Sequence, residues 1–158
     1  MSGTSANQLL NLFLECGKVS TDTRQIEEGS IFFALKGVNF NGNAFAETAI
    51  DQGAAYVVVD ELAYTKSDNR YILVDDVLTS LQLLARDYRK LFHIPIIGLT
   101  GSNGKTTSKE LIAAVLSKRY RTHFTKGNFN NHIGVPLTLL QLKPDAQVAV
   151  IEMGANHQ

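Results

Sequence analysis

The chain has 158 residues, with 15 Lys and Arg against 15 Asp and Glu, four His, one Cys and no Trp. A hydrophobic content of 44% can build a core, so a wholly disordered chain is excluded. The lone Cys16 excludes an internal disulfide framework and suits a reducing compartment. No apolar run approaches the roughly 18 residues of a membrane-spanning helix, and the first residues lack the layout of a signal peptide. We therefore expect a soluble, cytoplasmic protein that does not bind membranes.

The even charge balance hides an asymmetry along the chain. Residues 1–92 carry 8 basic and 12 acidic side chains, whereas residues 93–158 carry 7 basic and 3 acidic ones and all four His. A change of sign suggests two units with different partners, and the basic second half is a candidate for binding phosphate. Neither half has the charge density expected of a protein that binds nucleic acid.

Helical and strand patterns alternate in the first half of the chain. Apolar spacing of three to four residues predicts helices, glycines mark their ends, and continuous β-branched runs predict buried strands. Pro95 disfavours helical geometry just before it and ends the last helix. The expected elements are helix 7–15, turn 20–24, strand 31–35, loop 36–43, helix 44–52, strands 56–60 and 71–74, and a helix from 77 to about 92.

A fresh series of elements begins after residue 92, where we place a domain boundary. The helix that follows the first strand has an apolar stripe that we expect to be buried, made of Leu111, Ile112, Val115 and Leu116. Alternating strands and helices predict an α/β fold with parallel sheets in both units. The second unit has too few strands for a complete doubly wound sheet, as if cut short. Its expected elements are strand 94–100, a glycine turn, the striped helix, strand 122–124, a short helix around 137–142 and strand 148–153.

The segment TGSNGKTT, residues 100–107, is the strongest chemical signal. It follows a buried strand and opens a helix, which is the context of a phosphate-binding loop. Gly101 and Gly104 let the backbone bend so that successive N–H groups face one concavity, and the helix N-terminus adds positive potential there. Lys105 can reach the outer phosphates, and the Thr106 hydroxyl can bind Mg²⁺. The general pattern G-x4-G-K-[ST] would place its first glycine at Leu99, one residue later than the glycine at 98.

Two further features lie where strands or loops meet helices. Asn128, Asn130, Asn131 and His132 share one short loop, and side-chain amides can hold phosphate or sugar groups, although three Asn in four positions equally suit ordinary turns. Glu152 closes the apolar run VAVIE, and ligand sites of parallel sheets lie at this end of the strands. A carboxylate there is a candidate Mg²⁺ ligand.

The first half offers hydroxyl, amide and guanidinium groups around glycine turns, in STDTR at 20–24 and in the 36–43 loop. This composition suits a nucleotide or sugar, but spacing alone does not separate it from plain loops. Cys16 is interpreted as a small packed residue. The remaining histidines show no metal-ligand spacing and are predicted to lie on the surface, namely His93, His123 and His157.

Together these segments resemble the Mur ligase family, whose members build the peptide of bacterial cell-wall precursors. TGSNGKTT resembles the family's phosphate loop T-G-x-N-G-K-[ST], which accounts for the displaced glycine. STDTR-x4-GSIFFALKG, followed by NGNAFAETAIDQGAAYVVVD, is similar to the family's uridine-nucleotide-binding domain. GNFNNHIGVPLTLLQL and VIEMGANH are most similar to the member that adds D-alanyl-D-alanine. NGN at 41–43 departs from the commoner Asp-Gly-His, keeping hydrogen-bonding groups but losing a charge and an imidazole.

The resemblance implies an α/β fold in which residues 1–92 form a uridine-nucleotide-binding domain and residues 93–158 form the first part of a P-loop parallel-sheet ATPase domain. It implies a monomeric ligase that uses ATP and Mg²⁺ to join D-alanyl-D-alanine to UDP-N-acetylmuramoyl-tripeptide through an acyl phosphate. The family's third domain, for the amine, would be missing, so we expect the chain by itself to form no amide bond.

The resemblance also implies roles for individual residues. The catalytic residues would be Lys105, Asn130 and Asn131, and the metal ligands would be Thr106 and Glu152. ATP would bind to Thr100, Gly101, Ser102, Asn103, Gly104, Lys105, Thr106 and Thr107. The UDP-linked substrate would bind to Thr21, Asp22, Thr23, Arg24, Lys36, Gly37, Asn41, Gly42, Asn43 and Asn128.

Three other interpretations compete with this one. The nearest is the Mur ligase that adds the third, diamino residue, which the GNFNNHIGVPLTLL segment argues against. A second is a nucleotide-binding module without catalysis. A third is a P-loop kinase or regulatory ATPase, which the acidic first half with its STDTR and NGN loops argues against.

Overall fold

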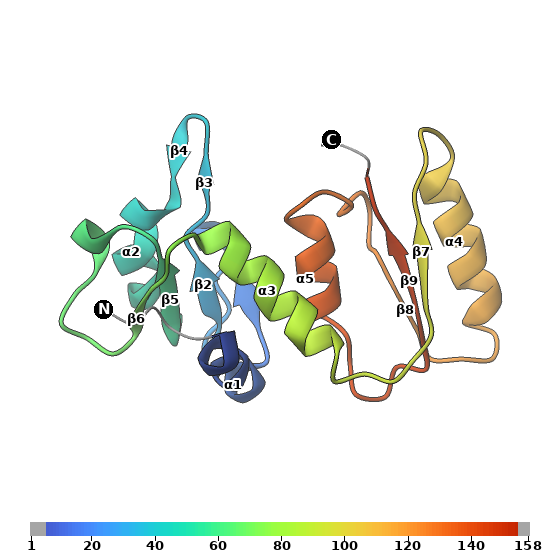
Figure 1. Cartoon of the computed structure of the whole chain (residues 1–158), viewed down its shortest axis with the longest axis horizontal. Coiled ribbons are helices and arrows are strands. Elements are labelled where there is room, and N and C mark those ends of the chain that lie inside the picture. Colours follow the sequence, from blue (N-terminus) through green and yellow to red (C-terminus); the bar gives the residue numbers. More distant parts are fainter. Residues whose placement is uncertain (1–5, 155–158) are drawn as a thin grey trace. The chain divides into compact units, whose positions relative to one another are not determined.

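The computed structural model describes residues 6–154 and has the predicted α/β fold (Figure 1). The chain forms two compact units, Met1–Leu84 and Ala85–Gln158. Their division falls inside helix α3 (Val77–Arg89), upstream of the boundary expected after residue 92, which stays a prediction. Within residues 6–154, no helix has both the length and the apolar character needed to cross a membrane.

The first unit is built on a four-stranded parallel sheet with strand order β1-β2-β5-β6. A two-stranded antiparallel hairpin, β3-β4, projects from it (Figure 1). The elements before α3 are α1 (Ala6–Cys16), β1 (Val19–Ser20), η1 (Thr23–Gln25), β2 (Ile31–Phe33), β3 (Lys36–Gly37), β4 (Phe40–Asn41), η2 (Gly42–Phe45), α2 (Ala46–Asp51), β5 (Tyr56–Val59), η3 (Leu62–Tyr64) and β6 (Tyr71–Leu73).

Strand alternation divides the core of the first unit between the two faces of the sheet. Phe32 and Val57 pack with Ala46 and Ala49 of α2 on one face. Their neighbours along the strands point to the opposite face because successive side chains of a strand alternate, and these are also fully buried. The opposite set comprises Ile31, Phe33 and Val58. The continuous apolar runs therefore mark strands covered on both sides, as predicted.

The segment 36–43 differs from the expected loop. Its two ends pair as the β3-β4 hairpin, with Lys36 opposite Asn41 and Gly37 opposite Phe40, and η2 follows directly. Each strand has only two residues, too few for an alternating pattern to be visible in the sequence. The helices expected over 7–15, 44–52 and 77–92 are confirmed with small shifts at their ends.

The second unit holds a three-stranded parallel sheet with strand order β7-β9-β8. Helix α4 connects β7 to β8, α5 connects β8 to β9, and the two helices lie on opposite faces of the sheet (Figure 1). The strand expected over 122–124 is confirmed. The elements are β7 (Ile96–Leu99), α4 (Lys105–Leu116), β8 (Thr122–Phe124), α5 (Gly134–Leu140) and β9 (Val148–Glu152).

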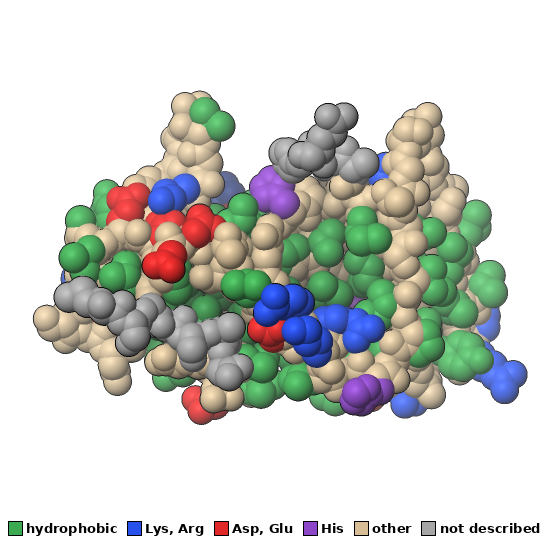
Figure 2. All heavy atoms as spheres, viewed as in Figure 1, with side chains coloured by type: hydrophobic (Ala, Val, Ile, Leu, Met, Phe, Trp, Pro, Cys, Tyr) green, Lys and Arg blue, Asp and Glu red, His purple; other side chains and the backbone are tan. Residues whose placement is uncertain are grey.

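The predicted buried stripe of α4 is wrong for two of its members. Leu111 and Val115 are 64% and 72% exposed, whereas Lys109 and Ala113 are the buried residues of this helix. Both pairs are four residues apart, and an offset of two residues turns about 200° around a helix, so the pairs lie on opposite sides. Figure 2 shows hydrophobic side chains on the surface over α4. The side of α4 that faces the sheet therefore carries Ala113 and Lys109.

Gly42 provides a direct test of packing at the start of η2. A Cβ atom there would lie 2.3 Å from the carbonyl oxygen of Leu35 and 2.6 Å from the carbonyl carbon of Ala34, which are backbone atoms that cannot turn aside. We expect Gly42→Ala to lower the free energy of unfolding by about 1–3 kcal/mol. Gly37→Ala in the same hairpin is the matched control, since its Cβ would meet only the Cβ of Phe40 at 4.0 Å. Urea unfolding of both variants measures the difference, and equal stabilities would contradict this packing.

Candidate functional site

Three predicted functional segments of the second unit meet at one edge of its sheet. Because β7, β8 and β9 are parallel, the segments that follow them emerge at the same edge. These segments are the glycine loop after β7, the asparagine loop after β8, and Glu152 at the end of β9. Strand β9 is the middle strand and Leu99 is in register with Glu152, so the carboxylate lies between the two loops.

The glycine loop is open and ends in a helix N-terminus. Gly101 and Gly104 have φ of +140° and +74°, and added Cβ atoms would find no atom within 4 Å at either position. The loop residues 100–104 are exposed. The ammonium of Lys105 bends back and donates to the carbonyl of Gly101. Positive φ at two glycines before a 12-residue helix is the backbone form predicted for a phosphate-binding loop.

Glu152 joins residues from both loops. Its Oε1 accepts a hydrogen bond from the Thr106 hydroxyl at 3.1 Å and another from Nδ2 of Asn130 at 2.7 Å. Its backbone N–H donates to Oγ1 of Thr125, which starts the asparagine loop, at 2.9 Å. The carboxylate is fully buried. The structure therefore brings together the predicted residues Thr106, Asn130 and Glu152, which are up to 46 positions apart in the sequence.

The second carboxylate oxygen of Glu152 has a different environment. Oε2 is buried and accepts no hydrogen bond, and the Nζ atom of Lys109 lies 3.5 Å away. Burial by itself would raise the pKa of Glu152. Hydrogen bonds from Asn130 and Thr106, together with the charge of Lys109, instead hold this pKa below its usual value, so the group is a carboxylate at neutral pH.

Sequence reasoning missed Lys109 and Thr125. Lys109 follows Thr106 by three residues on α4, a spacing that puts both on one face of a helix. That spacing was a usable signal for Lys109. Thr125 carried no comparable signal, because its contact depends on the pairing of β8 with β9.

These oxygens suit Mg²⁺. Mg²⁺ prefers oxygen ligands and is bound by one or two protein groups together with substrate phosphates and water. Thr106 and Glu152 supply a hydroxyl and a carboxylate beside the glycine loop, and the buried Oε2 accepts no hydrogen bond. Among residues 6–154, no cluster of three or more His, Cys, Asp or Glu side chains could hold a metal. The donor set thus fits a metal that arrives with a nucleotide.

The other two asparagines of the loop have different surroundings. Oδ1 of Asn131 accepts from the N–H groups of Ile133 and Gly134 at 3.1 and 2.7 Å, which caps the start of α5. Asn128 is exposed on the same loop. The contact of Asn131 is the local turn role that its position also suited, and the substrate-facing roles of both residues stay predictions.

In the first unit, the predicted substrate residues follow the ends of parallel strands β1 and β2. Asp22 caps η1 by accepting from the N–H of Arg24 at 2.9 Å, and its carboxylate also binds the Arg24 guanidinium. Hydrogen bonds from Arg24 lower the pKa of Asp22 to about 2. Arg24 is exposed, and Thr21 and Thr23 beside it are half-buried.

A second cluster in the first unit is centred on Asp60, which follows β5. The carboxylate of Asp60 accepts from Nδ2 of Asn43 at 2.8 Å and from the N–H of Val77 at 3.3 Å, and the ammonium of Lys36 lies 3.0 Å away. Burial would raise the pKa of Asp60, but these contacts together hold it below its usual value. Asn43 is completely buried, and its side-chain oxygen Oδ1 accepts from the N–H of Asp60.

The same cluster includes Asn41 and Glu61. Asn41 donates to Glu61 at 3.1 Å and accepts from the backbone of Asn43 at 3.0 Å. Of the predicted substrate residues in this loop, Lys36 and Asn41 are therefore accessible and tied to acidic partners, while Gly42 and Asn43 are buried. Sequence reasoning missed Asp60, although it closes the apolar run YVVVD just as Glu152 closes VAVIE.

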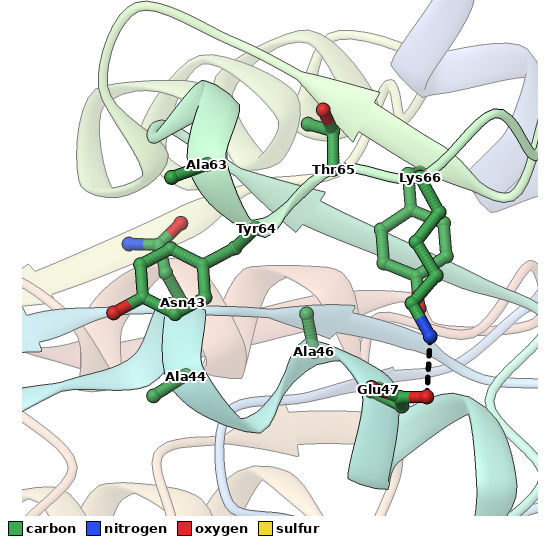
Figure 3. A pocket seen from close by; sticks show the side chains of 9 residues that line it. Asn43, Ala44, Ala46, Glu47, Ala63, Tyr64, Thr65 and Lys66 are labelled. Carbon is green, nitrogen blue, oxygen red and sulfur yellow. Dashed lines mark hydrogen bonds and ion pairs between the residues drawn. The ribbon is translucent and has the colours of Figure 1, made fainter.

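A small pocket lies beside this cluster (Figure 3). Its volume is about 130 Å³, below the roughly 300–1,000 Å³ of ordinary ligand pockets. An ion pair between Lys66 and Glu47 closes one side of it. The pocket is therefore too small to enclose a nucleotide.

The predicted surface histidines divide into three cases. His93 is exposed as expected. The prediction is wrong for His123, which is half-buried on β8 with Nε2 2.8 Å from the carbonyl of Thr138. Burial lowers the pKa of His123. His157 lies outside the described residues.

Comparison with known proteins agrees with this geometry. The model of the Mur ligase family catalytic domain matches residues 16–89, and that of the Mur ligase middle domain matches residues 99–158. The chain belongs to the Mur ligase family.

Within the family, its relatives include the UDP-N-acetylmuramoyl-tripeptide–D-alanyl-D-alanine ligases of Bacillus subtilis and Escherichia coli. The first is 47% identical over 98% of this chain and 34% of its own length. The second is 44% identical over 89% of this chain and 30% of its own. The chain thus spans about a third of these relatives.

Solved structures of such ligases share the fold. MurF from Acinetobacter baumannii matches the whole chain with a TM-score of 0.85 and 33% identity, over 37% of its own length. MurF from Thermotoga maritima, solved in complex with ADP, matches 89% of the chain with a TM-score of 0.80 and 31% identity, over 32% of its own length.

The Asp60 cluster generates a prediction with a defined pH dependence. The folded pKa of Asp60 lies below the unfolded value of about 4. Its carboxylate therefore stabilises the fold above that pH, and the contribution is lost as the pH falls through the folded pKa. We expect Asp60→Asn to lower the free energy of unfolding by about 1–3 kcal/mol at pH 7, with a smaller loss at pH 3.

Urea unfolding at pH 7, 5 and 3 measures this difference. Asp75→Asn, at an exposed position after β6, is the matched control and should change stability little at any of these pH values. A loss for Asp60→Asn that is constant from pH 7 to pH 3 would show that the charge of Asp60 does not stabilise the cluster.

Proposed function

We propose that the protein is an ATP-dependent ligase that joins D-alanyl-D-alanine to UDP-N-acetylmuramoyl-tripeptide through an acyl-phosphate intermediate. The observation that carries the proposal is the meeting of Thr106, Asn130 and Glu152 beside an open glycine loop. The chain's similarity to the D-alanyl-D-alanine ligases of Bacillus subtilis and Escherichia coli supports the proposal. We further propose that it acts as a monomer in the cytoplasm, which suits a free Cys16.

In the first step, a carboxylate oxygen of the tripeptide attacks the γ-phosphorus of ATP, the bond to the bridging oxygen breaks, and ADP leaves. Such a transfer needs positioning and charge neutralisation more than covalent chemistry from the protein. The glycine loop 100–107 would hold the phosphates, and Lys105 would leave its contact with Gly101 to neutralise them. Mg²⁺ bound by Thr106 and Glu152 would supply Lewis-acid stabilisation of the phosphoryl charge.

In the second step, the amine of D-alanyl-D-alanine attacks the acyl carbon, phosphate leaves, and the amine loses a proton. Asn130, which is hydrogen-bonded to Glu152, would face both the phosphates and the substrate. Asn128 and Asn131 lie on the same loop. The UDP end would bind the first unit, where Arg24, Lys36 and Asn41 are the accessible polar groups beside the strand ends.

Amine selectivity tests the proposal. The complete gene product should form product from ATP, UDP-N-acetylmuramoyl-tripeptide and D-alanyl-D-alanine, measured by release of phosphate and by mass of the product. Lys105→Met should lower kcat/KM at least about 100-fold, because it removes the only positive charge that the loop supplies to the phosphates.

The competing interpretations give different results in the same assay. Product from diaminopimelate or lysine with a dipeptide substrate, and none with D-alanyl-D-alanine, would indicate the ligase of the third residue. Binding of nucleotide without any amide product would indicate a binding module. Either result would refute the proposed reaction.

A further inference from the structure

Lys109 is a fully buried lysine to which the reaction described above gives no role. It lies on α4, one helical turn after Thr106, and none of its side chain is exposed. Burying an ammonium group is costly unless polar partners replace the water it loses. The helix itself does not need a lysine there, because Ala113, the other buried residue of α4, packs without a charge.

Two partners of Lys109 come from two of the three segments that form the candidate site. Its Nζ donates to the carbonyl of Gly127, in the asparagine loop, at 2.9 Å. It also lies 3.5 Å from Oε2 of Glu152, at the end of β9. A third contact, 3.1 Å to Oε1 of Glu110, involves the next residue on the same helix, whose side chain is 54% exposed, so it joins Lys109 to no other segment of the site. The interior contacts therefore define the role.

Together with Thr106 and Asn130, Lys109 holds the Glu152 carboxylate in one orientation. Thr106 and Asn130 hold Oε1, while Lys109 is the positive charge that faces Oε2, which accepts no hydrogen bond. With one oxygen held from each side, the carboxylate has a defined orientation. The same lysine also holds the start of the asparagine loop, which carries Asn130, through its hydrogen bond to Gly127.

We infer that Lys109 is a positioning residue for the magnesium–nucleotide site, which orients Glu152 and the Asn130 loop toward the glycine loop before the ligand binds. The inference rests on the proposed function, since it assumes that Glu152 binds Mg²⁺. Lys109 itself touches no substrate in this scheme and acts through Glu152 and Gly127. Groups that orient metal ligands in this way change metal affinity by about 10- to 100-fold when they are replaced.

Nucleotide binding measured with and without metal tests the inference. Calorimetric titration of the complete gene product with ADP, at stepped Mg²⁺ concentrations and in EDTA, gives the Mg²⁺ concentration for half of the gain in affinity. We expect Lys109→Met to raise this concentration at least about tenfold, with ADP affinity in EDTA and the KM for the UDP-linked substrate unchanged within about twofold. Lys118→Met, at an exposed lysine just after α4, is the matched control and should match the unchanged protein.

A double-mutant cycle separates positioning from a general loss of structure. In a Glu152→Gln background, Lys109→Met should change the Mg²⁺ requirement by less than about twofold, because the group through which it acts has lost its charge. Should Lys109→Met unfold, judged by its circular dichroism melt, Lys109→Gln carries the same expectation, since it removes the charge but keeps a donor for Gly127.

The outcomes distinguish this inference from the proposed function. A Mg²⁺ requirement unchanged in Lys109→Met, or an equal loss of ADP affinity with Mg²⁺ and in EDTA, would overturn the positioning role and leave the proposed function intact. ADP binding to the unsubstituted protein that does not depend on Mg²⁺ at all would refute the metal site on which the inference rests, whereas failure of the proposed function would appear as the absence of amide product.

Discussion

The carboxylate of Glu152 is charged, buried and placed at the end of the middle strand of its sheet, and this combination constrains every segment around it. A buried charge without partners would destabilise the fold by several kcal/mol. The hydroxyl of Thr106, the amide of Asn130 and the ammonium of Lys109 all point to it, from two segments separated by the whole of β8. Stability of the unit and assembly of the site thus depend on the same group.

The first unit repeats this arrangement with Asp60. There, too, an acidic residue ends a buried parallel strand, and its carboxylate contacts Lys36 of β3 and Asn43 of η2. The two units differ in what remains accessible. Around Asp60, the side chain of Asn43 is buried and hydrogen-bonded within the fold, while Lys36 and Asn41 remain accessible. Around Glu152, an open glycine loop and a helix N-terminus adjoin the carboxylate, so the second unit holds the site suited to phosphate chemistry.

Much of the fold could be predicted from local patterns. β-Branched runs such as YVVVD and VAVIE marked strands because both of their faces are covered, and the glycine loop was recognised because its backbone conformation is encoded by the glycines themselves. Glu152 could be placed at the C-terminal end of its strand because it closes the apolar run VAVIE. These predictions depend on a few consecutive residues and on general rules of parallel sheets.

What depends on contacts between distant residues could not be predicted. The burial of Lys109, and the exposure of Leu111 and Val115, follow from which side of α4 faces the sheet, and residue type alone favoured the opposite side. Likewise, Asn43 offered the same amide as Asn130, yet it is fixed inside the fold by Asp60. The roles of the remaining predicted site residues depend on ligands and stay predictions.

The most direct measurement is a titration of the ¹⁵N-labelled protein with magnesium–ADP, followed by backbone amide NMR. If the bend between β7 and α4 binds phosphate, the largest shift changes should fall on the amides of the 101–107 loop, with smaller ones at Glu152 and Asn130. Saturating ligand that leaves those amides unmoved, or that shifts chiefly the first unit, would contradict the account.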